Sequence, residues 1–490
     1  MSTHHDSQVR AFDLRAAERQ AMAEHGFEPD FPPEVERQLT ELVAHPPEAG
    51  AAAKDLRHLL WSSIDNDTSR DLDQIEYVEK LSNGDVRVMI GIADVDLYVP
   101  KGSAIDRHAA LETATVYSGV TIFPMLPAEL SAGLTSLLEG QDRACIVTEF
   151  VLDSQGRAPT SQIYPALVRN QAQLAYNSVG AWLEGKAEAP AKVAASGELQ
   201  AQLRLQNEVA QRLRTKRFER GALTLETIET RAVLEGGAMD IASEERNPAT
   251  DLIEDFMVAT NGVVARTLRE KRIPSIRRIV KTPKRWDRIV QLAAQLGEEL
   301  PAEPDSKSLN DFLCRRKEQD PDHFADLSLA VVKLMGPGEY VLERPDDKPE
   351  GHFALAVEDY THSTAPNRRY ADLVTQRLIK AMIAGNPSPY SDEELTAIAA
   401  NCTNKATAER KVEREMQKRI AAVAMRHRIG QMFHAIVTGV TDRGTFVRTL
   451  TPHVDGMLVH GQQGVDVGDR LNVKLVRTDP VHGFIDFARA

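Results

Sequence analysis

Four aspartates stand within nine residues near the start of this chain, and no other feature restricts its fold as strongly. They are Asp65, Asp67, Asp71 and Asp73, in the segment 63–77 that reads SIDNDTSRDLDQIEY. Carboxylates this close repel one another, so a fold that keeps them ionised must supply a cation or expose them to solvent. Their oxygens are hard ligands, which favour Mg²⁺ or Mn²⁺ over zinc. A turn in which the acids only cap local structure is the competing interpretation.

A calcium-binding loop is a second alternative. Asp65, Asp67, Ser69 and Glu76 fall at positions 1, 3, 5 and 12 of an EF-hand. Position 6 of such a loop requires glycine for its sharp turn, and this chain has Arg70 there. The residues that follow the acids also have the pattern of a strand rather than of a helix. The calcium loop is therefore poorly supported.

The acidic segment is followed by a predicted β-hairpin. Residues 74–81 and 86–94 are rich in β-branched and aromatic residues, and SNGD at 82–85 between them is a turn sequence that favours positive φ. The acids then lie at the open end of the hairpin. Strand ends hold metal ligands more rigidly than a mobile loop does, so this is a plausible catalytic geometry.

A second informative segment lies far along the chain and carries paired arginines. Residues 360–370 read YTHSTAPNRRY, in which Pro366 fixes the backbone just before Arg368 and Arg369. A guanidinium can bind two phosphate oxygens at once and neutralise the charge that develops on them. Dense carboxylates together with such a loop suggest a metal-dependent enzyme that acts on phosphodiesters.

Length and composition limit the class of protein. The 490 residues are enough for two or three domains, and 42% hydrophobic with 27% charged residues is ordinary for a soluble protein. No apolar run is long enough to cross a bilayer and no secretory signal is evident, so we expect a cytoplasmic protein. The net charge of −13 argues mildly against a protein coated in nucleic acid, but a local basic face can serve an acidic chain.

The chain divides into three parts by pattern, and its fold class is α+β. Residues 1–55 are expected to form a small helical module, either a helix-turn-helix-like RNA contact or an appendage. Residues 56–430 mix strands with helices and end in one long candidate helix over 393–428. Residues 431–490 carry five short strands separated by Gly and Asp turns, which predicts an OB-type barrel.

Three side chains of the predicted barrel are candidates to stack on bases. They are Phe433, Phe446 and His460. OB barrels commonly bind single-stranded nucleic acid through aromatic groups. Each of the three is equally compatible with a place in the barrel core.

Taken together, these motifs resemble the ribonuclease II / ribonuclease R (RNB) family of exoribonucleases over roughly residues 56–490. The metal motif of that family is D-x5-D-x-D-D, and Asp65, Asp71 and Asp73 match it. Residues 351–373, GHFALAVEDYTHSTAPNRRYADL, resemble the family's GHFxLAxxxYTHFTSPIRRYxDL. The resemblance implies a large mixed α/β catalytic domain of RNB type, closed by a C-terminal five-stranded OB barrel of the S-one type.

The resemblance also implies an activity. It is the processive hydrolysis of single-stranded RNA from the 3′ end to nucleoside 5′-monophosphates, with two Mg²⁺ ions that Mn²⁺ can replace. Two ions about 3.5–4 Å apart would activate the attacking water and stabilise the leaving 3′ oxygen. The ligand candidates are Asp65, Asp71, Asp73 and Gln74, and Asp73 is expected to be indispensable. Single-stranded RNA is the expected partner of a monomeric chain, with no membrane and no obligate protein partner.

Further residues receive roles from the same resemblance. Arg368 matches the catalytic arginine of the family, and Arg369 is either a second phosphate contact or a structural ion-pair partner. Glu409 matches a glutamate near the 3′-terminal nucleotide, while Tyr117 and Tyr176 match tyrosines that pack on the terminal nucleotides. Stacking suits an enzyme that ignores base sequence, since every base has a π-face. Without the resemblance, Glu409 would be interpreted as a surface charge and each tyrosine as core.

One departure from the family pattern lies in the metal motif. Gln74 stands where the fourth aspartate is expected, which removes a negative charge but keeps a carbonyl oxygen that can bind a metal or its water. We expect weaker binding of the second metal, offset by Asp67. A catalytically impaired RNA-binding protein with the same fold is the alternative.

The other departure is at the front of the chain, where related enzymes carry two cold-shock barrels. One five-stranded barrel needs about 60–70 residues, so two cannot fit before residue 56. We expect the helical module to replace them. Loss of that clamp would widen the RNA entrance and change the tolerance for structured RNA.

Overall fold

A six-stranded sheet forms the centre of the computed structural model, which describes residues 12–226, 229–235, 238–244 and 246–490. The strands run in the order β1–β8–β2–β3–β4–β7, and β7 pairs again with β8, so the sheet closes on itself. They are β1 (Lys54–Asp55), β2 (Trp61–Asp65), β3 (Gln74–Lys80), β4 (Val86–Ala93), β7 (Asp142–Leu152) and β8 (Thr160–Ala175).

The predicted hairpin is present as β3 and β4. The two strands pair antiparallel from Gln74 opposite Ile92 to Lys80 opposite Val86. On its other side β3 lies beside β2, where Ser62 is opposite Glu76. Strands β2 and β3 therefore run in opposite directions, and the acidic segment joins the end of β2 to the start of β3. The acids thus lie at the open end of the hairpin, as the sequence predicted.

Different helices cover the two faces of the sheet. Side chains alternate along β3, so Ile75 packs on one face and Val78 on the other. The first face is covered by α3 (Ala104–Glu112) and α11 (Tyr370–Ile383). The second is covered by α4 (Tyr176–Leu183), α6 (Gly197–Glu219) and α7 (Pro248–Glu270), with the short α5 (Ala191–Ala194) beside α6.

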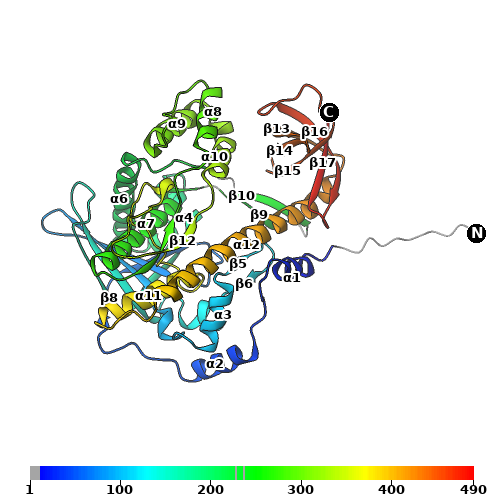
Figure 1. The fold of residues 1–490 in the computed structure, drawn as a ribbon. Helices are drawn as coiled ribbons and strands as arrows, with labels where there is room; N and C mark the ends of the chain where they lie inside the picture. The colour runs from blue at the N-terminus through cyan, green and yellow to red at the C-terminus, as the bar shows by residue number, and fades with distance from the viewer. Residues whose placement is uncertain (1–11, 227–228, 236–237, 245) are drawn as a thin grey trace, which may run out of the picture.

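The long C-terminal helix of the catalytic region, α12 (Asp392–Ala424), confirms the expected helix over 393–428 apart from its last turn. Ser391 and Glu394 form a capping box at its start. Three acids in its first turn stabilise the helix by their attraction to the positive end of its dipole. The helix ends in a 3₁₀ turn, Met425–Arg428. Figure 1 shows α12 running from the sheet to the C-terminal barrel.

The predicted barrel is confirmed as a closed five-stranded structure. Its order is β13–β14–β15–β17–β16. Phe446 is 38% exposed, whereas Phe433 is 8% exposed and packs against Phe487. Of the two places left open for Phe433, the structure supports the barrel core, where its side chain is buried. The strands are β13 (Met432–Thr441), β14 (Gly444–Thr449), β15 (Asp455–His460), β16 (Arg470–Asp479) and β17 (Phe484–Arg489).

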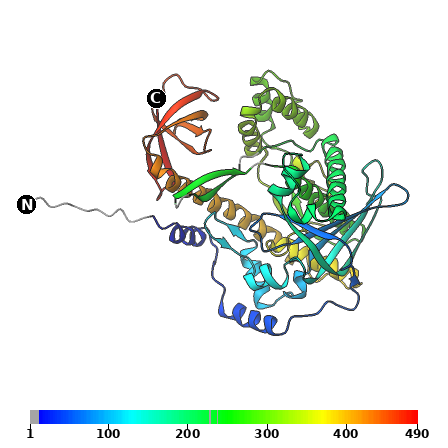
Figure 2. The ribbon, with the colours of Figure 1, turned by 180° about the vertical axis from the view of Figure 1, so that it is seen from behind.

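A helical lobe with its own apolar core stands on the same side of α12 as the barrel, as both ribbon views show (Figures 1 and 2). Asp326 of the lobe forms an ion pair of 2.7 Å with Arg448 of the barrel. The lobe comprises α8 (Trp286–Gln295), α9 (Ser306–Gln319) and α10 (Pro321–Met335). Two antiparallel pairs of strands complete the region, β9 (Glu229–Glu235) with β10 (Ala238–Glu244), and β11 (Ser275–Ile279) with β12 (Glu339–Glu343).

The two helices expected near the N-terminus are present, and each packs against a different part of the following region. Helix α1 (Leu14–Glu24) packs against α12 and against the small sheet of β5 (Val116–Tyr117) and β6 (Ile122–Phe123). Helix α2 (Pro33–Ala44) packs against α3, and Val35 joins the main core. Each helix is thus part of the catalytic region at a different place. None of the helices in the described ranges is long and apolar enough to cross a membrane.

Candidate active site

The acidic segment links the ends of β2 and β3. Asp65 is the last residue of β2, and Asp73 directly precedes β3, with Asp71 between them. Oδ1 of Asp65 accepts hydrogen bonds from the backbone N–H of Asn66 at 2.7 Å and from the Ser69 hydroxyl at 2.9 Å. Burial raises the pKa of Asp65, against the effect of these hydrogen bonds. The loop therefore orients one carboxylate oxygen of Asp65 and leaves the other for a ligand.

Asp73 is the most deeply buried of the four aspartates, at 2% exposure. Its Oδ1 accepts a hydrogen bond of 2.9 Å from the backbone N–H of Asn367. Its Oδ2 has no hydrogen-bond partner among the residues that the structure describes. Burial raises the pKa of Asp73 to about 7, although the nearby Arg368 guanidinium lowers it. An acid held in this way is costly for the fold, which points to a role beyond stability.

The two adjacent arginines have different surroundings. Nε of Arg368 lies 3.5 Å from Oδ2 of Asp73, and the Arg368 side chain is 44% exposed. Arg369 instead points its fork at Asp372, and its Nε and Nη2 each donate a hydrogen bond of 2.8 Å to that carboxylate. The ion pair fits the second of the two roles expected for Arg369. Arg368 is the arginine that can reach a phosphate.

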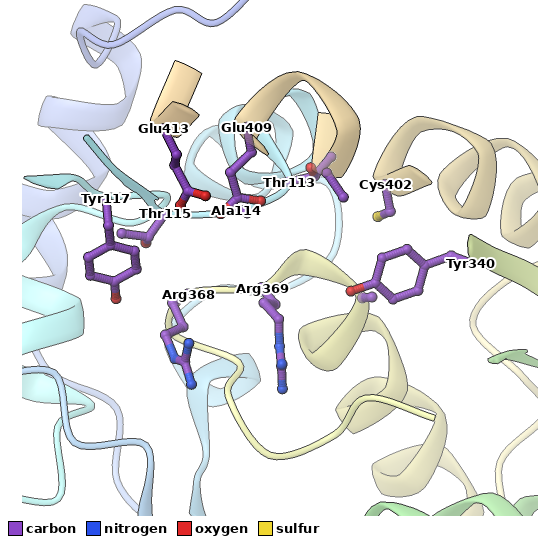
Figure 3. Close-up of a pocket in the computed structure, with 12 residues that line it drawn as sticks. Thr113, Ala114, Thr115, Tyr117, Tyr340, Arg368, Arg369, Cys402, Glu409 and Glu413 are labelled. Carbon is purple, nitrogen blue, oxygen red and sulfur yellow. The ribbon is translucent and has the colours of Figure 1, made fainter. Parts of the chain in front are cut away.

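A cavity of 250 Å³ lies beside these arginines. Figure 3 shows Glu409 and Glu413 reaching from α12 on one side, with Arg368 and Arg369 on the other and Tyr117 at one end. Burial, and then the neighbouring Glu413, raise the pKa of Glu409 to about 7. Two residues predicted for the site, Glu409 and Tyr117, therefore line the same cavity as the two arginines. The cavity is large enough for part of a nucleotide.

Tyr117 connects this space to a second, larger cavity. Its hydroxyl donates a hydrogen bond of 3.4 Å to Oδ2 of Asp71, and its side chain is 39% exposed. It also lines a cavity of 840 Å³ between α12 and the barrel, and Phe446 of the barrel lines the same cavity. The structure thus brings two of the predicted stacking residues, one from the catalytic region and one from the barrel, to a single cavity.

Tyr176 and Gln74 lie by the acids but line neither cavity. Tyr176 is the first residue of α4, and burial raises its pKa, as do the nearby Asp65 and Glu76. Gln74 is the first residue of β3 and is 8% exposed. By the alternation of side chains along the strand, Gln74 shares its face with Glu76 and Val78. Tyr176 is therefore close to Asp65, and both predicted residues lie on the side of the sheet covered by α4.

The side-chain oxygens of the ligand candidates fit a hard divalent cation. The candidates are Asp65, Asp71, Asp73 and Gln74. Oxygen is the ligand type that Mg²⁺ and Mn²⁺ prefer. The buried Oδ2 of Asp73 lacks a hydrogen bond, and a cation would satisfy it. In the described part of the chain, no three His, Cys, Asp or Glu side chains are already gathered as a ligand set. Mg²⁺ is usually held by one or two carboxylates with water and substrate phosphate, so the residues fit such an ion without a closed cage.

Three residues of this region were not singled out from the sequence as parts of the site. Asn367 holds Asp73 through its backbone N–H, a contact that leaves no signal in the sequence. Glu413 follows Glu409 by one turn of α12, and the i,i+4 spacing of two acids on a predicted helix could have revealed it. Glu76 follows Gln74 by two residues, and the period of a predicted strand could have placed both on one face.

Comparison with known protein families shows which family the chain matches. Residues 53–385, more than half of the sequence, match the RNB domain. The chain belongs to the RNB family. Residues 431–490, which form the barrel, match the RNase II-type exonuclease C-terminal S1 domain. The family inferred from the Asp and Arg motifs is thereby confirmed, and so is the nature of the C-terminal barrel.

Similar curated proteins of the RNB family carry the name ribonuclease R. The protein of Thermotoga maritima is 31% identical over 493 residues, which cover 94% of this chain and 68% of the relative. That of Escherichia coli is 31% identical over 458 residues, which cover 90% of this chain and 55% of the relative. The chain thus spans between about half and two thirds of the length of these relatives.

Solved structures of the RNB family share the fold. The apo form of Mycoplasma genitalium RNase R superposes with a TM-score of 0.85 at 24% identity, covering 98% of this chain and 78% of that chain. Yeast Ssd1, described as a pseudonuclease, superposes with a TM-score of 0.73 at 17% identity, covering 95% of this chain and 58% of that chain. Because this fold occurs in a nuclease and in a pseudonuclease, activity must be argued from the residues of the site.

Proposed function

We propose that this RNB-family chain is a divalent-metal-dependent 3′→5′ exoribonuclease that degrades single-stranded RNA processively to nucleoside 5′-monophosphates. The observation that carries the proposal is the buried Asp73, whose Oδ2 lies without a hydrogen bond 3.5 Å from Nε of Arg368. A protein that only bound RNA would have no use for a buried acid that costs stability. The relatives named ribonuclease R support the same activity.

Each residue beside the phosphate has its own part in the proposed reaction. Asp65, Asp71, Asp73 and the carbonyl oxygen of Gln74 would hold two Mg²⁺ ions, for which Mn²⁺ can substitute. When bound, such ions supply activation of the attacking water and stabilisation of the leaving 3′ oxygen. Arg368 grips the non-bridging oxygens of the scissile phosphate and offsets the negative charge that grows on them in the transition state.

The RNA chain is held by groups that do not depend on base sequence. Tyr117, Tyr176 and Phe446 offer aromatic faces on which successive bases stack. Glu409 faces the cavity beside the arginines, where its carboxyl group accepts hydrogen bonds from the ribose hydroxyls of the 3′-terminal nucleotide. Stacking and ribose contacts of this kind let the strand advance one nucleotide at a time, whatever the base.

A catalytically impaired RNA-binding protein is the second candidate, and Gln74 is the observation that favours it. A metal site with one carboxylate fewer binds divalent cations less tightly. The yeast pseudonuclease Ssd1 has the same fold, so the fold does not exclude this candidate. The retained Asp73 and Arg368 argue for activity, because RNA binding alone does not require their juxtaposition.

The deciding experiment is a time course on a 5′-labelled single-stranded oligoribonucleotide with Mg²⁺, comparing the wild type with Asp73→Asn. We expect the wild type to convert full-length RNA to a short end product with few intermediates, and Asp73→Asn to leave the RNA intact while still binding it. RNA that stays intact with the wild type but shifts on a gel would instead establish the binding protein. Internal cleavage products would reject an exonuclease.

Tolerance for structured RNA is a separate part of the proposal. Mycoplasma genitalium RNase R has also been solved in complex with double-stranded RNA, and that structure superposes with a TM-score of 0.85 at 25% identity. We expect this chain to enter the stem of a hairpin that carries a single-stranded 3′ tail. Products that end several nucleotides before the stem would show a narrow entrance and reject this expectation.

A further inference from the structure

Glu76 is a fully buried acid that the proposed reaction leaves without a role. Its exposure is 0%, and neither of its side-chain oxygens has a hydrogen-bond partner among the described residues. The nearby Gln206 of α6 donates toward the Ser62 hydroxyl and the backbone oxygen of Glu76 rather than toward the carboxylate. A buried carboxylate without a donor lowers stability, so its presence needs an explanation outside folding.

Strand geometry places Glu76 beneath Gln74 on the same face of β3. Side chains two residues apart in a strand point to one side and start about 6.6 Å from each other. Val78, the next residue on this face, packs under α4, α6 and α7. The Glu76 carboxylate therefore lies on the side of the sheet from which Tyr176 approaches the acids.

Electrostatic coupling connects the same groups. Burial raises the pKa of Glu76 well above its usual value, and the nearby Asp65 raises it further. The pKa of Tyr176 is raised in turn by both Asp65 and Glu76, after burial. Asp65 and Tyr176 are therefore near enough to Glu76 for their charges to influence one another.

The number of negative charges near the metal motif suggests a role for Glu76. The family motif has an acid at residue 74, where this chain has glutamine, and this chain has Glu76 two residues later on the same strand face. Asp67, which the sequence suggested as the compensating acid, is instead exposed on the loop. Glu76 is thus better placed than Asp67 to restore the charge.

We propose that Glu76 belongs to the divalent-metal site and supplies the negative charge that Gln74 lacks. The proposal rests on the proposed metal-dependent function and adds a residue to it. Gln74 keeps an oxygen ligand at the strand end, and Glu76 provides the carboxylate from one step deeper in the sheet. A cation bound on this side compensates the buried charge, which explains why the fold retains an acid with no donor.

The test is the binding of Mn²⁺, measured by electron paramagnetic resonance on the full chain with a nucleoside 5′-monophosphate present. We expect Glu76→Gln to weaken Mn²⁺ binding about tenfold or more. The double variant Gln74→Asp with Glu76→Gln returns the carboxylate to the family position, and we expect it to recover the affinity. Glu79→Gln is the matched control, since Glu79 lies on the same strand with its side chain 43% exposed, and its affinity should equal that of the wild type.

Thermal unfolding with and without Mn²⁺ separates a metal role from a purely structural one. If Glu76 belongs to the metal site, Mn²⁺ raises the Tm of the wild type and of the double variant but not that of Glu76→Gln. Equal Mn²⁺ affinity and equal Tm shifts in the wild type and Glu76→Gln would overturn the role of Glu76 and leave the metal-dependent function standing. A wild type that binds no Mn²⁺ would overturn both.

Discussion

Nε of Arg368 lies 3.5 Å from Oδ2 of Asp73, and the backbone N–H of the preceding Asn367 donates to Oδ1 of the same carboxylate at 2.9 Å. One loop thus contacts both oxygens of the buried acid. The loop is itself fixed, because Asp372 accepts a hydrogen bond of 2.8 Å from the backbone N–H of Ala365. The backbone of this loop therefore holds Arg368 beside Asp73, and in the proposed reaction this arrangement prepares the place of a phosphate before RNA binds.

Replacement of Arg368 by alanine should lower kcat far more than it raises KM. In the proposed reaction the guanidinium stabilises charge that is present mainly in the transition state, and loss of one such group costs about 10²–10³ in rate. Arg368→Lys should recover part of the rate, because lysine offers a point charge without the fork. Single-turnover hydrolysis of a labelled oligoribonucleotide measures the effect. Arg272→Ala is the control, since that side chain is 68% exposed, and an unchanged kcat for Arg368→Ala would remove Arg368 from the reaction.

Arg369→Ala should act on stability instead. It leaves Asp372, whose side chain is 0% exposed, as a buried charge without its ion-pair partner. Breaking a buried pair from one side costs about 3–5 kcal/mol of unfolding free energy. Urea unfolding measures this cost, and the double variant Arg369→Ala with Asp372→Ala should lose less than the sum of the two single variants. A variant with unchanged stability but weakened RNA binding would show that Arg369 contacts phosphate.

Local signals in the sequence were enough to predict several elements. The SNGD turn predicted the hairpin of β3 and β4, because turn chemistry depends on neighbours in the chain. The long helix expected over 393–428 is present as α12. The placement of α1 and α2 could not be predicted in this way. Each packs against a helix that lies far away in sequence, and two amphipathic helices separated by a Pro-rich stretch look the same whether they pack on each other or apart.

The sequence motifs name candidate site residues but not the contacts between them. Asp73 and Arg368 are visible in motifs, whereas the contact of Asp73 with the Asn367 backbone depends on tertiary structure. The barrel gives a similar example. Phe433 and Phe446 are both aromatic residues on short strands, and only the register of the closed sheet decides that the first is core and the second faces a cavity.

Phe446→Ala should weaken the binding of single-stranded RNA without lowering stability. Its side chain is 38% exposed and lines the same cavity as Tyr117, and stacking on one base is worth about 1–3 kcal/mol, or roughly a 5- to 150-fold change in Kd. Fluorescence anisotropy of a labelled oligoribonucleotide, with Asp73→Asn as the background to prevent hydrolysis, measures this change. Phe433→Ala is the contrasting variant, because it empties the barrel core and should lower the Tm. Equal Kd values for Phe446→Ala and its parent would exclude stacking.

Glu409 should make stability fall as the pH rises through the weakly acidic range. Its pKa in the folded protein is raised to about 7, by burial and then by Glu413, whereas a glutamate in an unfolded chain titrates at about 4.3. Between these values the folded state keeps a proton that the unfolded state has released, so the stabilising contribution is complete below about pH 4 and is lost by about pH 7. Glu409→Gln cannot titrate. Its unfolding free energy relative to the wild type should therefore increase by about 3–4 kcal/mol across this range and stay level above it. Urea unfolding at a series of pH values, with Glu79→Gln as the control, measures the difference, and a difference that does not vary with pH would contradict the shifted pKa.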